Sequence, residues 1–155
     1  SEAGERGPFI NSNAQASLLG LNSNHRFPEI VRCFIEGLCF AAKECYLAIG
    51  EIPKEIRLAG GGAQSKSIRK IFSNILQTNV RTSNRKEAGA AGAAMIGAMS
   101  LGLYNEWTKC MDEWVSPFLG ELENFDNNYS NTYEKLFKTY LDSRSKITPI
   151  WEQLN

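Results

Sequence analysis

Residues 56–65 read Ile-Arg-Leu-Ala-Gly-Gly-Gly-Ala-Gln-Ser, and this stretch decides the fold. Its first four residues predict a short β-strand, and the apolar residues that recur after Ser65 predict an amphipathic helix. Glycines between a strand and a helix allow a positive φ and keep side chains away from a ligand, and the N–H groups at a helix N-terminus attract an anion. The stretch is therefore a candidate phosphate-binding loop. A tight turn without a ligand is the alternative.

Two known phosphate-binding motifs come close to this loop but do not fit it. From Gly60 to Ser67 the residues approach the P-loop pattern, but Ser65 stands where that motif requires its second glycine. The dinucleotide fingerprint fails at Ser65 as well, and the next predicted strand, 79–83, carries no Asp or Glu that could bind a ribose. An NAD-dependent oxidoreductase is therefore the least favoured of the nucleotide-binding classes.

Hydrophobic periodicity on either side of the loop predicts alternating strands and helices. Strands are expected at 16–21, 56–59 and 79–83, and helices at 27–49, from 65 onward, at 86–103, around 107–115 and from 129 onward, with a polar loop at 120–131. This order predicts an α/β layered domain with a small sheet. We expect a single domain over 1–155 that consists of an opening loop at 1–13, a core at 16–103 and C-terminal helices at 104–155.

The expected helix at 27–49 carries the longest apolar stripe in the chain. Pro28 suits its first turn, and Gly50 is placed to end it. We expect this helix to be the main core element, with Phe34 buried. Its stripe consists of Phe27, Ile30, Val31, Phe34, Ile35, Leu38, Ala42, Cys45, Tyr46 and Ile49.

Composition excludes several classes of function. The 155 residues include 17 Lys and Arg and 17 Asp and Glu, so the basic surplus of a nucleic-acid-binding protein is absent. The longest uncharged apolar run, 88–99, is too short to span a bilayer. We therefore expect a cytoplasmic protein without nucleic-acid or membrane partners. The opening at Ser1, without a methionine, indicates a piece of a longer chain.

The cysteine and histidine content argues against a zinc site. Only one histidine occurs, His25, and no C-x-x-C pair occurs among the cysteines, which are Cys33, Cys39, Cys45 and Cys110. Three of these cysteines lie on the apolar helix at 27–49, where thiols behave as small hydrophobes. We therefore expect buried, reduced cysteines.

Two separated stretches resemble the C-terminal domain of the FGGY family of carbohydrate kinases. The first runs from Ala16-x-Leu18-x-Gly20-Leu21 to Glu29-Ile30-x-x-Cys33-Phe34-Ile35-Glu36, and it departs from the family at Cys33 and Phe34, where smaller residues are usual. The second runs from Arg57 to Ser65 and from Lys86 to Ala94, and it is similar to the family's adenosine-phosphate loop and the helix behind it. The opening Gly4-Glu5-Arg6-x-Pro8 resembles the loop ahead of the first stretch.

This resemblance implies an actin-like, ribonuclease-H-like ATPase fold, with the chain as the C-terminal half of a two-domain kinase. It implies ATP as the phosphate donor, Mg²⁺ as the metal and a sugar or polyol hydroxyl as the acceptor. The residues that would bind the nucleotide are Gly60, Gly61, Gly62, Gln64 and Ser65. Because Ser65 stands where glycerol kinases commonly carry Asn, the loop resembles the pentulose and polyol kinases, which implies a xylulose-like pentulose or related polyol as substrate.

The chain lacks the other half of such an active site. Phosphoryl transfer to a hydroxyl needs a positioned carboxylate, a magnesium site and a sugar pocket. In the family, the catalytic aspartate, the metal ligands and most sugar contacts lie upstream. We therefore expect no catalytic residue or metal ligand here, an inactive isolated chain and sugar binding mainly through the absent N-terminal domain, and a homodimer is left open. The aspartates, expected on solvated surfaces, are Asp112, Asp126 and Asp142.

Other residues near the loop have competing interpretations. Lys66 and Arg69 could assist a bound anion, but we expect solvated helix-face residues. Glu87 is expected to cap the next helix, whose small residues leave a face for close core packing or for a flat ring, namely Gly89, Gly92, Ala93 and Gly97. A non-catalytic nucleotide-binding or interaction module of the actin-like superfold is the alternative function.

Overall fold

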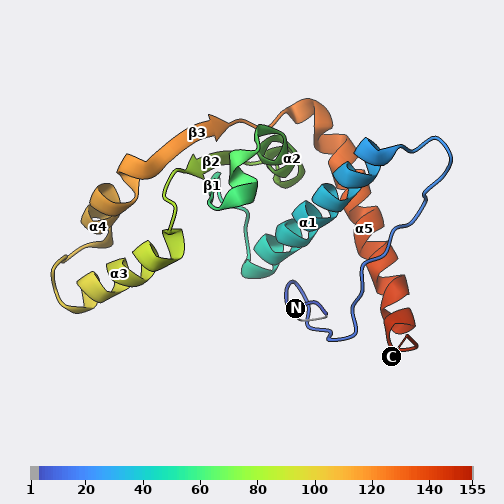
Figure 1. Ribbon diagram of the computed structural model, residues 1–155, viewed down its shortest axis with the longest axis horizontal. Coiled ribbons are helices and arrows are strands. Elements are labelled where there is room, and N and C mark those ends of the chain that lie inside the picture. The colour runs from blue at the N-terminus through green and yellow to red at the C-terminus, as the bar shows by residue number, and fades with distance from the viewer. Residues whose placement is uncertain (1–3, 155) are drawn as a thin grey trace. The chain divides into compact units, whose positions relative to one another are not determined.

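The computed structural model describes residues 4–154 and divides into two compact units. The helical unit contains the residues up to Pro53, residues 74–77 and the residues from Asp126 onward, and the sheet unit contains Lys54–Ser73 and Thr78–Phe125. The expected α/β class with a small sheet is confirmed. Figure 1 shows the elements, which are α1 (Phe27–Ile49), β1 (Glu55–Leu58), η1 (Gly61–Gln64), α2 (Lys66–Leu76), β2 (Asn79–Ser83), α3 (Ala88–Ser100), α4 (Trp107–Trp114), η2 (Ser116–Phe118), β3 (Leu119–Glu123), η3 (Asn127–Tyr129) and α5 (Ser130–Trp151).

The sheet unit is built on three strands in the order β1-β2-β3. β1 pairs in parallel with β2, with Ile56 opposite Val80, and β2 pairs antiparallel with β3. Along β2, the buried residues Val80 and Thr82 alternate with half-buried ones, which is the period of a strand that packs on one face. The first two strands therefore lie within one residue of the positions that the sequence predicted.

The third strand corrects the expectation of a polar loop at 120–131. Its sequence, Leu-Gly-Glu-Leu-Glu, has little strand propensity of its own. It becomes a strand because β2 offers it an edge with unpaired backbone groups. Conversely, the strand expected at 16–21 does not form, since no strand in the described part of the chain lies beside it.

The core of the helical unit lies between α1 and α5. The ring centroid of Phe40 on α1 lies 6.3, 5.9 and 5.5 Å from those of Tyr133, Phe137 and Tyr140 on α5. Spacings of four and three residues place these α5 rings on one helical face. Lys43 is buried next to them, with its ammonium 4.9 Å from the centroid of the Phe137 ring. Aromatic packing around Phe40 therefore joins the two helices.

The apolar stripe of α1 does not form the core that the sequence predicted. Phe34 is 51% exposed, and Phe27 and Leu38 are more exposed still. The helix itself has the predicted bounds, because Pro28 lies in its first turn and Gly50 ends it with a φ of 129°. None of the stripe residues is buried, and the buried residues of α1, which are Cys39, Phe40 and Lys43, lie outside the predicted stripe.

The cysteines are free, but they are not uniformly buried as expected. Cys39 and Cys110 are buried, Cys45 is half-buried and Cys33 is exposed. Burial, with a smaller contribution from the charge of Glu36, raises the pKa of the Cys39 thiol to about 12. The four thiols therefore differ in accessibility.

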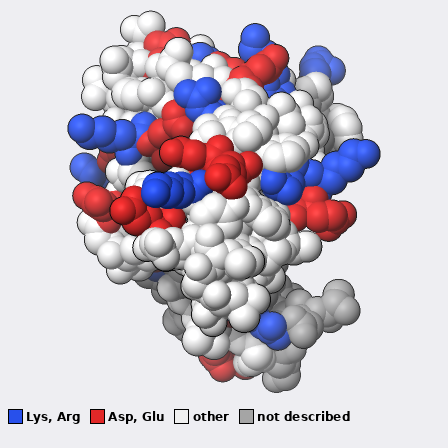
Figure 2. All heavy atoms as spheres, turned by 90° about the vertical axis from the view of Figure 1, so that its left-hand side faces the viewer, with Lys and Arg blue, Asp and Glu red and all other residues white. Residues whose placement is uncertain are grey.

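Charged residues of both signs are mixed on the surface. Figure 2 shows Lys and Arg side chains interspersed with Asp and Glu on the face that it draws. Such a mixture fits the formal net charge of zero. Across residues 4–154, none of the helices combines the length and the apolar character that crossing a bilayer requires.

Candidate functional site

The glycine loop joins the end of β1 to the start of α2. Gly60 has a φ of 88°, in the left-handed region that favours glycine, so the chain turns sharply there. Residues Gly61–Gln64 then form a 3-10 turn. In this turn, the N–H of Ala63 donates to the Gly60 carbonyl at 3.2 Å and the N–H of Ser65 donates to the Gly62 carbonyl at 3.3 Å. The loop is therefore an ordered turn with defined peptide orientations.

Gly61 and Gly62 leave open space beside the backbone. A Cβ placed on either residue would meet no other atom within 4 Å, and both residues are exposed. Glycine weakens regular structure by about 0.5–1 kcal/mol relative to alanine. Packing within this chain gives no reason for that cost, whereas room for a ligand does. The residues present thus fit a nucleotide.

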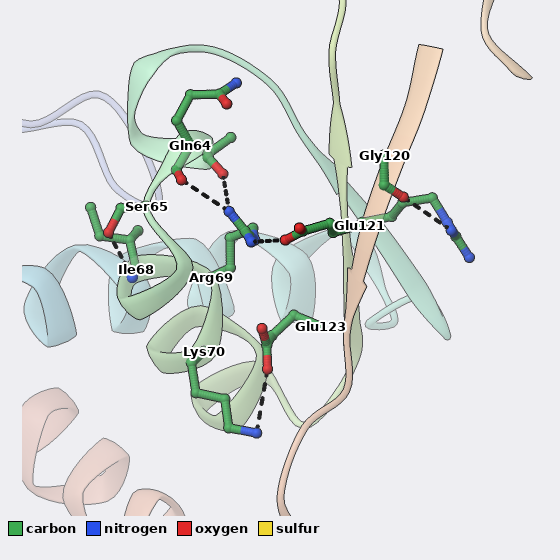
Figure 3. Close-up of polar contacts among 10 residues, drawn as sticks. Gln64, Ser65, Ile68, Arg69, Lys70, Gly120, Glu121 and Glu123 are labelled. Atoms are coloured by element: carbon green, nitrogen blue, oxygen red, sulfur yellow. Dashed lines mark hydrogen bonds and ion pairs between the residues drawn. The ribbon is translucent and has the colours of Figure 1, made fainter. Parts of the chain in front are cut away.

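Ser65 caps the helix that follows the loop. The N–H of Ile68 donates to Ser65 Oγ at 3.4 Å, as Figure 3 shows. The hydroxyl keeps its own O–H, which can donate to a ligand. Lys66 begins α2 and is exposed as expected, and the first N–H groups of a helix have no acceptor within it. The loop and the helix start therefore present several donors to an anion.

Arg69 corrects the expectation of a solvated helix-face residue. Its side chain is buried, and its Nη1 donates to the carbonyl oxygens of Ala63 at 2.9 Å and Gln64 at 3.1 Å (Figure 3). Its Nη2 donates to Oε2 of Glu121 on β3 at 2.6 Å. Gln64 itself is exposed, and its side chain points away from Arg69. Spacing was the available signal, because Arg69 lies about one helical turn after Ser65.

An open pocket of about 270 Å³ lies at the same edge of the sheet as the loop. Because β1 and β2 are parallel, Ala59 and Ser83 lie at neighbouring carboxyl ends, and both line the pocket. Ligands of α/β proteins bind outside the carboxyl ends of strands. The pocket is mostly apolar, and its other lining residues are Arg57, Arg85, Ala88, Ala91, Gly92, Met95, Trp114, Val115 and Phe118.

The expectations for α3 are met in part. Glu87 occupies the N-cap position, and its carbonyl accepts from the N–H of Ala91 at 3.0 Å, but its side chain makes no capping hydrogen bond. Gly92 lines the pocket. Close packing involves a different stripe of the helix, and the remaining small residues are exposed, namely Gly89, Ala93 and Gly97.

The three aspartates make local contacts. Two of them, Asp112 and Asp142, are exposed, and Asp126 is half-buried. Asp112 accepts from the Ser116 hydroxyl at 3.4 Å, and Asp142 accepts from Lys146 at 2.6 Å. Asp126 accepts from the N–H of Asn128 at 3.0 Å. Within residues 4–154, no three His, Cys, Asp or Glu side chains gather where they could hold a metal ion.

Comparison with known proteins identifies the family of this site. Residues 1–101 match the family model described as "FGGY family of carbohydrate kinases, C-terminal domain". The chain belongs to this family. FGGY carbohydrate kinases are ATP-dependent phosphotransferases, and the resemblance found in the sequence is confirmed.

Curated relatives of this FGGY domain are kinases of polyols and sugars. The chain is 49% identical over 154 residues to the erythritol kinase of Brucella abortus, which covers 99% of this chain and 30% of that protein. It is 28% identical over 142 residues to the xylulose kinase of Bacillus subtilis, with 88% of this chain and 28% of that protein covered. The chain therefore spans about 30% of the length of these relatives.

Solved structures share the fold of this FGGY domain. A ligand-bound xylulose kinase from Lactobacillus acidophilus matches with a TM-score of 0.87 at 24% identity, over 99% of this chain and 31% of that one. The glycerol kinase of Plasmodium falciparum, solved with ADP, matches with a TM-score of 0.69 at 20% identity, over 91% of this chain and 29% of that one. Both matches bear out the fold class.

Proposed function

We propose that this chain is the nucleotide-binding part of a kinase that transfers the γ-phosphate of ATP to a hydroxyl of a short polyol or sugar. The observation that carries the proposal is the open space beside Gly61 and Gly62, directly before α2. Membership of the FGGY family supports it. The residues proposed to bind the nucleotide are Gly60, Gly61, Gly62, Gln64 and Ser65.

Each part of the loop has a separate role in this proposal. Gly61 and Gly62 let the ribose or a phosphate approach the backbone. The Ser65 hydroxyl donates a hydrogen bond, and the positive end of the α2 dipole favours the negative charge. The apolar pocket beside Ala59 offers surface for the flat base at the same edge of the sheet.

The acceptor is proposed to be a short linear polyol. The erythritol kinase relative, at 49% identity, supports a four-carbon polyol, and the xylulose kinase relatives support a pentulose as second candidate. The full-length kinase that contains these residues should discriminate between the two. A higher kcat/KM for erythritol than for xylulose supports the first candidate, and the reverse order supports the second.

The isolated chain is proposed to have no kinase activity. Its three aspartates make local contacts, and the general base and the carboxylates that would hold Mg²⁺ are assigned to residues outside it. A positioned general base alone supplies about 10²–10⁴-fold in rate. An ADP-release assay with ATP, Mg²⁺ and a panel of polyols and pentuloses tests this, and sugar-dependent turnover above background would contradict it.

A cytoplasmic location and a homodimer are separate proposals. Cell fractionation tests the location, and sedimentation velocity tests the oligomeric state.

Titration of the ¹⁵N-labelled chain with ADP tests the proposed site. Amide shifts should concentrate at residues 60–66 and in the first turn of α3. Shifts confined to α5 would overturn the assignment. If ADP binds at the loop but Gly61→Val leaves turnover of the full-length kinase unchanged, the loop belongs instead to a non-catalytic nucleotide-binding module.

A further inference from the structure

We propose that Arg69 is a positioning residue for the nucleotide loop, and this inference rests on the proposed function for its ligand. Arg69 does not need to touch the nucleotide. It holds the last two carbonyls of η1 and thereby sets the direction of the peptide groups that join Ala63, Gln64 and Ser65, directly after the glycines. Ala63 and Gln64, whose carbonyls it holds, are the last two residues of the 3-10 turn.

The geometry of two adjacent peptide groups gives this contact its effect. A trans peptide is planar, so holding its C=O also fixes the direction of its N–H. The carbonyls of Ala63 and Gln64 belong to the peptide groups that carry the N–H of Gln64 and of Ser65. The Ser65 N–H in turn donates to the Gly62 carbonyl at 3.3 Å. One guanidinium nitrogen therefore orients the backbone from Gly62 to Ser65.

A second anchor connects the loop to the sheet. The Nη2 of Arg69 donates to Glu121 on β3 at 2.6 Å, and β3 pairs with β2 (Figure 3). The Arg69 side chain is 5% exposed, while that of Glu121 is 77% exposed. Arginine suits this place because its planar fork can reach the carbonyls and the carboxylate in fixed directions.

Arginine is a costly choice if its role is only to fill space. Taking a charged group out of water costs free energy, and an apolar side chain of similar volume is often as stabilising as a buried ion pair. In addition, the buried Nε of Arg69 has no hydrogen-bond partner within the described residues. Control of the loop geometry accounts for a guanidinium at this position, whereas packing alone does not.

Lys70, the next residue, provides a matched control. Its Nζ lies 3.4 Å from Glu123 Oε1 (Figure 3). It also donates to the Asn124 carbonyl at 3.2 Å. Like Arg69, Lys70 is a cation on α2 that contacts a glutamate of β3. Unlike Arg69, it makes no contact with the glycine loop. Loss of Lys70 tests the effect of removing such a link by itself.

The experiment compares Arg69→Met, Arg69→Lys and Lys70→Met in the 155-residue chain. The Kd for ADP is measured by ¹⁵N NMR titration, the ligand-free amide shifts of residues 60–66 are recorded, and circular dichroism checks the fold. We expect Arg69→Met to weaken ADP binding by about tenfold or more, because small displacements of positioning groups have effects of this order. The Kd of Lys70→Met for ADP should stay within about twofold of that of the parent chain.

Arg69→Lys should give an intermediate Kd, because an ammonium is a point charge without a planar fork. A Kd between those of the parent chain and Arg69→Met would be the partial rescue that a loop-positioning role requires. If Arg69→Met does not fold, Arg69→Lys alone provides the test. Ligand-free amide shifts at Gly61, Gly62 and Ser65 should move in the Arg69 variants and not in Lys70→Met.

Two results separate this inference from the proposed function. If the parent chain binds no ADP, the proposed function fails, and the ligand-free amide shifts still decide whether Arg69 orients the loop. If the parent chain binds ADP and a folded Arg69 variant binds it equally well, the inference is overturned. Unchanged ligand-free amide shifts in a folded Arg69→Lys chain would overturn it as well.

Discussion

Gly120 on β3 lies so close to Thr82 on β2 that a Cβ at position 120 would be 2.2 Å from Thr82 Oγ1. The side-chain atoms of Asn84 would lie at 3.0 Å from the same Cβ. Thr82 is buried, so its hydroxyl has little room to rotate away. The close approach of the two antiparallel strands therefore requires glycine at this position.

Gly120→Ala is expected to lower the free energy of unfolding by about 1–3 kcal/mol, because overpacking forces its neighbours to shift. Urea unfolding followed by circular dichroism measures the loss. Gly61→Ala is the matched control, since its Cβ would meet no atom within 4 Å, and it should cause no loss, with a gain of up to about 1 kcal/mol. Equal stability of the two variants would contradict the pairing of β3 with β2.

Gly61→Val is expected to abolish ADP binding, because the branched side chain fills the space proposed for the ligand. The substitution should leave the fold intact, since the positive φ in this turn belongs to Gly60 and not to Gly61. Gly97→Val is the control, at an exposed glycine of α3 outside the pocket. Calorimetric titration should show binding by Gly97→Val and none by Gly61→Val, and the opposite pattern would refute the loop assignment.

Phe34→Ala should lower the free energy of unfolding by less than about 1 kcal/mol, because exposed positions contribute little. Phe40→Ala should lower it by about 3–5 kcal/mol, because it leaves a cavity among buried aromatic rings. Both residues lie on α1, so helix propensity changes in the same way in each variant. Urea unfolding of the two chains gives the comparison. A larger loss of stability in Phe34→Ala than in Phe40→Ala would show that the face carrying Phe34, and not the face carrying Phe40, packs in the core.

Cys33 should give the fastest thiol reaction at pH 8, and Cys39 should react only after unfolding. Burial raises the pKa of Cys39 to about 12 from the ordinary 9.0, so the folded chain keeps this thiol protonated. The associated stability is full below pH 9.0 and is lost as the pH rises toward 12. Reaction with a chromogenic disulfide measures the rates. Persistence of the fastest phase in Cys33→Ser would show that another thiol is accessible.

The sequence alone was sufficient for the elements whose signals are local. Helix α1 has its predicted bounds because Pro28 and Gly50 act on the backbone next to them. The first two strands were predicted from the residue pattern within each of them, and the glycine loop was predicted because glycine acts through its own φ and its missing side chain. The residues proposed to bind a nucleotide follow from that loop, so the candidate site could be proposed before its geometry was seen.

Only the tertiary structure decided which segments pair and which residues are buried. A strand forms where a partner edge exists, so β3 pairs with β2 while residues 16–21 remain without a ladder. Burial likewise depends on neighbours far along the chain. Arg69 is enclosed by the loop carbonyls and Glu121, whereas Phe34 has an ideal apolar spacing and remains half exposed. Periodicity shows which residues share a face of a helix, but the packing of other elements determines which face loses contact with water.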